Sequence, residues 1–539
     1  MTESPTTGST TTATQVDVVI HDLTVQAGTR ILLQDTSAIF AGGKITLLVG
    51  RSGVGKSTLL KIIADLLDPL EEGIRVQGQV QRRGADGQSL RRASSVGVVF
   101  QDHALFDELS SLQNVRLAQA HRAAASGPNP LLEPARLLEE LGVPADVPTR
   151  ALSGGQRQRL AIARTLAYDP DVMLYDEPTA GLDSATAGEV TRVIAATHAK
   201  HPCTSIVVTH DYESLARIAD AIYLIDPRTC TLLAVPRDEW SQLHKLLEQS
   251  GAGTDELLQA DTSRVPRVVR RVGRGVERFF HETSRMVESC LQVPWRLVPA
   301  WKSPRWGLRF FGHYLRAVAS PSAWLYIAIS GAIIGFVSTY FTFRFLPSAN
   351  YTKPLVIEDL LRSMGFALYR ILVPILATIL IAARCGAAVA SDVGGKRYGR
   401  QIDALRTLGV EPRRYLLTGI LYAFLLGTPW LLAIGYLAAA LTSLIVFTAT
   451  HIDRGPWFWQ LHFHRELIVP ERWFYAGTGW LLAKTTVCAA GIALIAYARG
   501  ARPKDSSSAV SQGVTSTILW ATLYVLAVHF AFAFFEFES

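Results

Sequence analysis

The sequence Gly50-Arg-Ser-Gly-Val-Gly-Lys-Ser57 satisfies every fixed position of the phosphate-loop pattern G-x-x-x-x-G-K-S/T. An apolar, β-prone run, Ile45–Val49, precedes it, and a stretch with helical spacing follows it. A strand, a glycine-rich loop and a helix in this order place backbone N–H groups and the positive end of a helix around a phosphate. The stretch therefore predicts a triphosphate site. The predicted phosphate-binding residues are Gly50, Ser52, Gly53, Gly55, Lys56, Ser57 and Thr58.

A second hydrophobic run, Val172–Asp176, ends in an aspartate, and Glu177 follows directly, so two carboxylates are adjacent there. Asp176 at a strand end can hold Mg²⁺ together with the hydroxyl of Ser57. Glu177 can orient and deprotonate a water molecule for in-line attack on the γ-phosphorus. We therefore predict ATP and Mg²⁺ as cofactors, with Glu177 as the catalytic base.

Four further motifs follow in a fixed order: Gln101 at the end of an apolar run, Leu152-Ser-Gly-Gly-Gln156, Asp183, and His210 after Ser205–Thr209. Together with the phosphate loop, this series resembles the ATP-binding cassette (ABC) ATPases from Val16 to about Lys245. The resemblance implies that Gln101 senses Mg²⁺ and the attacking water, that His210 contacts the γ-phosphate, and that Asp183 belongs to the Asp loop.

The Leu-Ser-Gly-Gly-Gln signature predicts an assembly. In the family that the sequence resembles, this signature caps the γ-phosphate held by the phosphate loop of the other subunit. One ATPase per chain then implies a homodimer. The residues that would act across the interface are Ser153, Gly154, Gly155 and Gln156.

No aromatic residue stands before the phosphate loop at the position where such ATPases usually stack the adenine. We expect the adenine to rest on an aliphatic surface such as Val25.

The length of 539 residues and an uneven composition predict several domains. The N-terminal part mixes charged, glycine-rich and apolar stretches, whereas apolar runs of membrane-spanning length dominate after Pro321. The expected fold is an α/β P-loop ATPase followed by an all-α polytopic membrane domain. We expect a disordered tail over 1–14, the ATPase over 15–245, a linker over 246–263, a basic amphipathic segment over 264–320 and a permease over 321–539.

The basic segment places the positive charge next to the membrane half. Between Arg264 and Arg316 there are 12 Arg and Lys residues against three Glu, interleaved with Trp and Phe. Such a pattern is typical of a helix in the interface of an anionic leaflet. Nucleic-acid binding is the less favoured alternative. The five cysteines show no C-x-x-C spacing, and neither a disulfide framework nor a zinc site is indicated.

Five apolar stretches are long enough to cross a bilayer, which takes roughly 20 residues. Six Arg and Lys residues in Ser391–Arg414 and three in Ala498–Gly513 place these loops on the ATPase side, which we expect to be cytoplasmic. The opposite loops, Leu346–Gly365 and Thr448–Gly477, carry two and three. The predicted spans are Trp324–Phe343, Phe366–Ala390, Tyr415–Phe447, Thr478–Tyr497 and Val514–Phe535.

The segment Ala383–Tyr415 contains an Arg-x-Gly element, with Arg384 followed by Asp392, and then Gln401-Ile-Asp-Ala-Leu-Arg-Thr-Leu-Gly-Val-Glu-Pro412. It resembles the signature of MlaE-type permeases of the Mla and Mce lipid-transport systems, with Asp392 where the family usually has Glu. Gln401–Leu408 is then expected to be a coupling helix, with Asp403 and Arg406 as candidate contacts. Arg370-Ile-Leu-Val-Pro374 matches the family's Arg-Glu-Leu-Gly-Pro only in part.

Charged side chains in or near the spans are costly unless they face protein or water. Arg370, Arg384 and Lys484 are therefore candidates for the translocation path or a lipid headgroup, with snorkelling at helix ends as the equally open alternative. Three histidines in one outer loop could hold a metal, but their scatter favours surface positions. They are His451, His462 and His464.

These features predict a homodimeric ABC half-transporter that moves a phospholipid-like lipid in a bacterial-type inner membrane. A separate Mce-type lipid-shuttling protein is a possible partner outside the membrane. Two alternatives are a complex that transmits mechanical force to an external partner and a small-molecule exporter. Short outer loops argue against the first, and ATPase-first order with five spans argues against the second.

Overall fold

The computed structural model describes residues 15–67, 73–84, 96–122, 132–210, 212–249, 301, 303–345, 349–471, 473–504 and 506–537. The predicted tail, nearly all of the predicted linker and most of the basic segment lie outside these residues. The chain divides into two compact units. One unit contains Met1–Val265 and Gly399–Val410, and the other contains Pro266–Tyr398 and Glu411–Ser539.

The first unit is built on a six-stranded sheet with the order β5-β6-β7-β3-β8-β9, in which only β9 runs antiparallel. Its inner strands are continuous apolar runs because both faces of a parallel sheet are covered. The strands are β3 (Ile45–Val49), β5 (Val96–Val99), β6 (Val172–Asp176), β7 (Thr204–Thr209), β8 (Ala221–Asp226) and β9 (Thr231–Val235).

Helices surround this sheet, and the sequence explains how several of them begin. Ser110 caps α3 and Ser153 caps α5, each in a capping box with a Gln three residues later. The helices are α1 (Lys56–Ile63), α3 (Ser111–Gln119), α4 (Pro134–Glu140), α5 (Gly154–Ala167), α6 (Ser184–Lys200), α7 (Tyr212–Leu215) and α8 (Leu243–Gln249). The last of these continues beyond Lys245, the predicted end of the domain.

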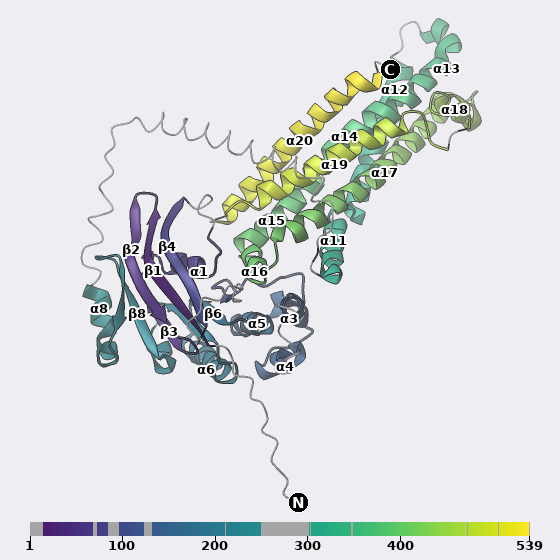
Figure 1. The fold of residues 1–539 in the computed structure, drawn as a ribbon. Helices are drawn as coiled ribbons and strands as arrows, with labels where there is room; N and C mark the ends of the chain where they lie inside the picture. The colour runs from purple at the N-terminus through teal and green to yellow at the C-terminus, as the bar shows by residue number, and fades with distance from the viewer. Residues whose placement is uncertain are drawn as a thin grey trace, which may run out of the picture. The chain divides into compact units, whose positions relative to one another are not determined.

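A second, antiparallel sheet with the order β2-β1-β4 lies in the same unit (Figure 1). Its strands are β1 (Val16–Ala27), β2 (Arg30–Phe40) and β4 (Ile74–Gly84). Apolar residues of this sheet, of β3, of β5 to β7 and of α1 form one hydrophobic core. Ala404 of α16 (Gln401–Thr407) belongs to that core, so a short segment that follows a membrane span in the sequence completes the ATPase unit.

The second unit is entirely helical in its described part, and five of its helical stretches are long and apolar enough to cross a membrane. These stretches are Pro304–Arg344, Val356–Tyr398, Arg413–Thr450, Thr478–Gly500 and Ser507–Glu536. The number agrees with the prediction. The second stretch starts earlier than predicted, because much of Leu346–Gly365, which was expected to be a loop, is helical in α13.

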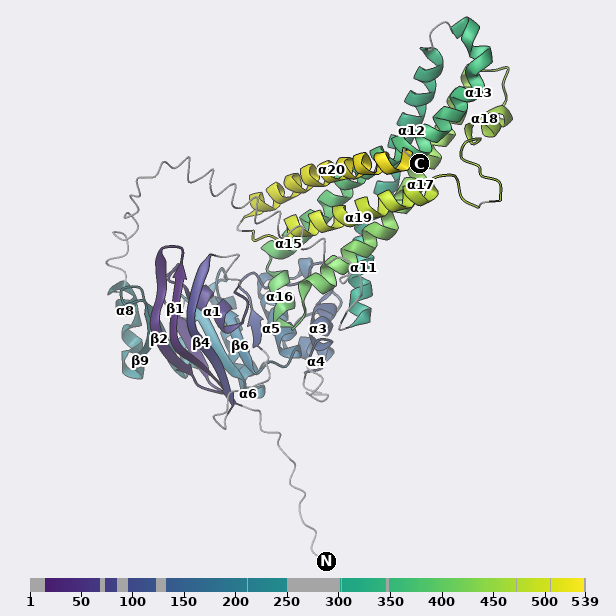
Figure 2. The same cartoon turned by 45° about the horizontal axis from the view of Figure 1, so that its top comes forward.

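Small residues let two of these helices approach closely. Gly331 and Gly335 of α12 lie against the backbone of Gly435 and Ala439 of α17, so any larger side chain at the two α12 positions would overlap that backbone. Figure 2 shows α12 and α17 beside each other. The helices of this unit are α11 (Pro304–Val318), α12 (Pro321–Arg344), α13 (Ala349–Ala367), α14 (Val373–Ile381), α15 (Ala387–Tyr398), α17 (Thr418–Thr450), α18 (Pro456–Phe463), α19 (Thr478–Gly500) and α20 (Ser507–Phe537).

Candidate nucleotide-binding and catalytic site

The phosphate loop joins the buried strand β3 to α1. Gly53 and Gly55 have φ angles of 78° and 107°, in the left-handed region that glycine enters at little cost. A Cβ atom on Gly55 would also lie only 3.2 Å from Leu32 Cβ. Glycine is therefore required at this corner, and its backbone N–H groups are left open to a phosphate.

The ammonium group of Lys56 is held over this loop. It donates hydrogen bonds to the carbonyl oxygens of Gly50 at 2.7 Å and Arg51 at 3.0 Å. Burial lowers the pKa of Lys56, and the nearby carboxylates of Glu177 and Asp176 act in the opposite direction. A bound phosphate would supply the negative charge that favours the protonated amine.

Asp176 ends β6 with only 1% of its surface exposed. The Ser57 hydroxyl donates to its Oδ1 atom at 3.2 Å. Ser57 and Asp176 are 119 positions apart in the chain. They meet because β6, β7 and β3 are parallel neighbours in the sheet, so the carboxyl ends of these strands share one edge. The two side chains offer hard oxygen donors, the kind that Mg²⁺ prefers.

The three predicted catalytic residues converge at the same edge. Glu177 Oε1 lies 3.2 Å from His210 Nδ1, and Gln101 Nε2 donates to Glu177 Oε2 at 3.4 Å. Glu177 has a φ of 49°, and its backbone N–H donates to the Val208 carbonyl at 2.9 Å, which holds the carboxylate beyond the strand end. The arrangement can present a carboxylate base to a water molecule between a glutamine and a histidine.

The signature residues start α5. The Ser153 hydroxyl accepts from the Gln156 N–H at 3.3 Å, and Gln156 Oε1 accepts from the Ser153 N–H at 3.0 Å. Gly155 is close to α6, since a Cβ atom there would lie 3.0 Å from Thr186 Cγ2. Asp183 caps α6 through Thr186, whose hydrogen bonds lower the pKa of this carboxyl group. The Asp loop and the signature are thus adjacent.

Arg164 is a residue that sequence reasoning missed. It lies on α5 with 2% of its surface exposed, and it donates to the His103 carbonyl at 3.2 Å and to the Ala104 carbonyl. Both carbonyls belong to residues with positive φ, 62° and 50°, just after Gln101. Burial lowers the pKa of Arg164 to about 10. An arginine on the predicted signature helix was the available signal, but nothing local identified its partners.

Arg400 is the second missed residue, and it lies on the segment Gly399–Val410 within the ATPase unit. Its Nη1 atom is 2.9 Å from Asp176 Oδ2. The helix α16 that follows agrees with the short helix expected over Gln401–Leu408. Asp403 and Arg406 on this helix pair with each other at 3.7 Å.

The prediction that Val25 offers a surface for the adenine was wrong. Val25 lies in β1 with 1% of its surface exposed, packed in the core between the two sheets. Its neighbours Thr24 and Gln26 are only partly buried. Val25 is therefore not an accessible platform for a base.

In the membrane unit, the predicted cations Arg370 and Lys484 meet at one carboxylate. Arg370 Nε lies 2.8 Å from Glu536 Oε1, and Lys484 Nζ lies 2.8 Å from Glu536 Oε2. Lys484 also donates to the Arg370 carbonyl at 2.6 Å. The three side chains are at most 15% exposed, which excludes snorkelling to a water surface for this pair. An acid at the end of an apolar helix was the signal for Glu536.

Arg384 and Asp392 contact residues other than the members of that cluster. Arg384 donates to the hydroxyls of Ser322 at 2.6 Å and Ser320 at 3.1 Å. Asp392 pairs with Lys396 at 2.8 Å and lies 3.3 Å from His313 Nε2. Arg370 and Arg384 each lie in a π-helical turn, Leu368–Leu372 and Ala382–Gly386, a distortion that is frequent at functional sites.

The prediction of surface positions for the outer-loop histidines was wrong for two of them. His462 and His464 are 8% and 6% exposed and pack among aromatic rings, including Phe458 and Trp459. His462 lies in the short helix α18 and His464 caps its end, so the helix places both rings inside the unit, which the sequence of a loop did not indicate. Among the described residues, no group of three or more His, Cys, Asp or Glu side chains is placed to hold a metal ion.

Comparison with known protein families finds two matches along the chain. Residues 33–180 match the ABC transporter family, and residues 314–535 match the family described as Permease MlaE. The first covers most of the phosphate, catalytic and signature residues. The second covers most of the described membrane unit.

Individual relatives match the ATPase part. The glutamine transport ATP-binding protein GlnQ of Bacillus subtilis is 41% identical over 36% of this chain and 81% of its own length. The intermembrane phospholipid transport system ATP-binding protein MlaF of Haemophilus influenzae is 35% identical over 39% of this chain and 80% of its own. A solved dimeric bacterial ABC transporter cassette is 29% identical over 38% of this chain and 93% of its own, with a TM-score of 0.32. The chain therefore belongs to the ABC transporters, and it carries an N-terminal ATP-hydrolysing domain fused to a permease domain of the MlaE family.

Proposed function

We propose that this protein uses ATP hydrolysis to move a phospholipid-like lipid across or out of a bacterial inner membrane. The observation that carries the proposal is the pairing of domains on one chain. The membrane domain matches MlaE permeases, and the ATPase is 35% identical to a protein named for intermembrane phospholipid transport. A permease family and an ATPase relative thus point to the same class of substrate.

For the chemistry, we assign the catalytic base to Glu177 and the orientation of the attacking water to Gln101 and His210. Their contacts of 3.2 and 3.4 Å to the two Glu177 oxygens support this assignment. Glu177 takes a proton from the water as the water oxygen attacks the γ-phosphorus. The bond from that phosphorus to the β–γ bridging oxygen breaks, and ADP and phosphate are the products. Ser57 and Asp176 would hold Mg²⁺, which neutralises charge on the phosphate oxygens when it is bound.

We propose a homodimer with two composite sites. Gly154 and Gly155 begin α5, where the first N–H groups of a helix lack intrahelical acceptors. The capping box uses the N–H of Gln156 and not those of the two glycines. Ser153 and Gly154 are exposed, so the positive end of α5 is available to the γ-phosphate of a second copy.

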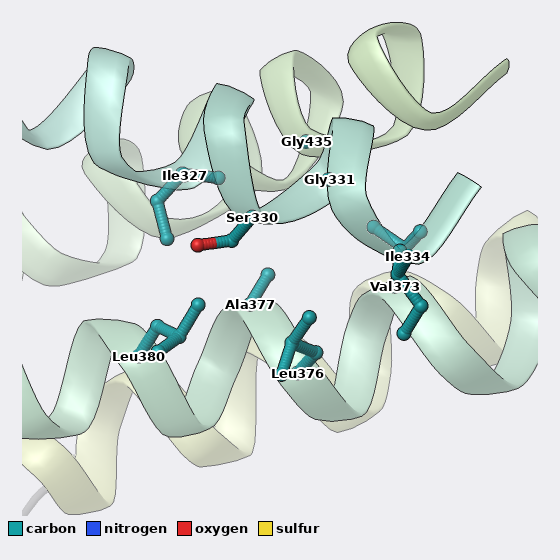
Figure 3. Close-up of a pocket in the computed structure, with 9 residues that line it drawn as sticks. All are labelled: Ile327, Ser330, Gly331, Ile334, Val373, Leu376, Ala377, Leu380 and Gly435. Carbon is teal, nitrogen blue, oxygen red and sulfur yellow. The ribbon is translucent and has the colours of Figure 1, made fainter. Parts of the chain in front are cut away.

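For the lipid path, we propose the space between α12, α14 and α17. Figure 3 shows the residues that line a pocket there, which are apolar apart from one hydroxyl. They are Ile327, Ser330, Gly331, Ile334, Val373, Leu376, Ala377, Leu380 and Gly435. The apolar lining matches an acyl chain in character, but the pocket in this structure has room for little more than a water molecule. We therefore propose that these helices separate here to admit the lipid. Arg384 is our candidate for the headgroup end, because Arg370, Lys484 and Glu536 already pair with one another within the protein.

We also propose that α16 is the coupling helix. The segment containing α16 follows one candidate span and precedes another, yet Ala404 packs in the ATPase core. A helix connected to two spans can pass a movement of the ATPase to the permease. An Mce-type protein outside the membrane remains the proposed partner, as the family of the permease suggests.

The test uses full-length protein in proteoliposomes with a fluorescent phospholipid. We expect ATP-dependent lipid transfer that is lost in Glu177→Gln, while mass spectrometry of the purified protein finds bound phospholipid. ATP hydrolysis without ATP-dependent lipid movement, with no co-purified lipid, would overturn the lipid assignment. A light-scattering mass equal to one chain in the active preparation would overturn the homodimer.

A further inference from the structure

Arg400 bridges two acidic residues of the nucleotide site. Its Nη1 atom lies 2.9 Å from Asp176 Oδ2, and its Nε atom lies 3.9 Å from Asp102 Oδ2. Asp102 directly follows Gln101. The other oxygen of Asp176 accepts the hydroxyl of Ser57 at 3.2 Å. The guanidinium therefore occupies one of the two oxygens of the carboxylate that would hold a metal ion.

The position of Arg400 is set by the segment that carries it. Arg400 precedes α16 with φ of 53° and ψ of 15°, a left-handed conformation that is unfavourable for a residue with a Cβ atom. Such a conformation persists when its surroundings determine it. Here α16 packs against β5, and Ala404, one turn further on, lies in the ATPase core.

We propose that Arg400 and Mg²⁺ compete for Asp176, so that binding of the Mg–nucleotide complex releases Arg400. A guanidinium and a metal ion on one buried carboxylate repel each other, and this repulsion is weakly screened at a site that is 1% exposed. Release of Arg400 removes an ion pair that holds Gly399–Val410. Metal loading and the Arg400–Asp176 ion pair are then alternatives, while Ala404 keeps its place in the ATPase core.

Competition between Arg400 and Mg²⁺ depends on the ATPase site and not on which molecule the permease moves. It differs from a purely structural role for Arg400, in which the ion pair would stabilise α16 without affecting the metal. Competition predicts that removal of Arg400 changes the Mg²⁺ concentration needed for nucleotide binding, whereas a purely structural role predicts no such change. A failure of lipid transport would leave the proposal standing, and a failure of the Mg²⁺ test would leave lipid transport standing.

The first experiment measures binding of a fluorescent ATP analogue to the full-length protein in nanodiscs while Mg²⁺ is titrated. A Glu177→Gln background prevents turnover. We expect Arg400→Gln to lower the half-saturating Mg²⁺ concentration by about three- to tenfold, the range of a charge-assisted contact that is partly exposed. Binding of the analogue in EDTA should be unchanged. Arg400→Lys should fall between the two proteins.

Arg413→Gln is the matched control, because Arg413 is an exposed arginine shortly after the same segment. It removes the same charge and should leave the Mg²⁺ dependence unchanged. If Arg400→Gln behaves like this control, or requires more Mg²⁺, the competition does not exist. An equal change in affinity with Mg²⁺ and with EDTA would also overturn it, since Arg400 would then act on the nucleotide.

A second measurement follows the segment itself by hydrogen–deuterium exchange of peptides that cover residues 399–410. In the Glu177→Gln protein we expect faster exchange with ATP and Mg²⁺ than with ATP and EDTA. With Arg400→Gln added, exchange should already be fast in EDTA. Equal exchange in all four conditions, with unchanged melting temperatures, would contradict the release of Arg400.

Discussion

The ATPase unit and the membrane unit satisfy their charged side chains in different ways. In the ATPase, Lys56 and Glu177 lie at the ends of strands and loops, where a nucleotide, a metal ion and a water would complete their contacts. In the membrane unit, Arg370 and Lys484 are neutralised by Glu536 within the protein. A residue of the first kind should matter for activity, and a residue of the second kind should matter for stability.

The largest effect is expected for Glu177→Gln. Loss of the base should reduce ATP hydrolysis by about 10²- to 10⁴-fold, the usual contribution of a general base, while ATP binding persists. The melting temperature should change little, because Glu177 has only polar contacts at an accessible site. The measurements are steady-state ATPase activity and thermal unfolding, with the exposed Glu239→Gln as control. Near-normal hydrolysis in Glu177→Gln would remove Glu177 from this role.

Glu536→Gln should instead reduce stability. It leaves the buried cations Arg370 and Lys484 without a carboxylate, and breaking a buried ion pair costs about 3 kcal/mol or more. Adding Lys484→Met should recover part of the loss by removing one unpaired charge. The control is Glu466→Gln, whose partner Arg362 is 42% exposed, so its loss should cost about 1 kcal/mol or less. Thermal unfolding in detergent measures all four, and equal losses would refute the contrast.

Arg164 is an exception to this contrast, because it is a cation of the ATPase unit that is buried and whose partners lie within the protein. Arg164→Met should leave the carbonyls of His103 and Ala104 without their donor and cost about 2 kcal/mol. The loop after Gln101 should also lose its position, so the hydrolysis rate should fall. Thermal unfolding and ATPase assays test both effects. A large loss of activity with unchanged stability would place Arg164 with the catalytic residues.

The smallest change in stability is expected for exchanging Asp403 and Arg406. The two side chains pair with each other at 3.7 Å, so Asp403→Arg with Arg406→Asp keeps the pair and should alter stability by about 0.5 kcal/mol or less. Lipid transfer per ATP hydrolysed should fall if α16 transmits force through the order of these charges. Proteoliposome transfer and ATPase rates measure that ratio. An unchanged ratio would mean that these charges take no part in coupling.

The nucleotide site could be predicted from the sequence because its parts are local. A strand, a glycine-rich loop and a lysine occupy adjacent positions, so Gly50–Ser57 specify their own geometry. The convergence of Gln101, Glu177 and His210 follows from their places at the ends of parallel strands. The number of membrane spans follows from apolar length.

The contacts that could not be predicted join residues far apart in the chain. Arg370 and Glu536 are separated by 166 positions, and Arg400 and Asp176 by 224. An isolated charge in an apolar run shows that a partner is needed without saying which residue supplies it. The prediction that His462 and His464 lie at the surface failed for a related reason. A loop sequence with scattered polar residues does not reveal which side of a short helix will face the interior.

The place of Ala404 in the ATPase core has a consequence for how the protein is made. The ribosome releases the ATPase sequence well before it reaches residues 399–410, which complete the same unit. Until two membrane spans have been synthesised, the newly made ATPase exposes the apolar surface that Ala404 later covers. The core of the ATPase unit is thus completed only after two candidate membrane spans have been made, and an ATPase released before that point lacks this part of its core.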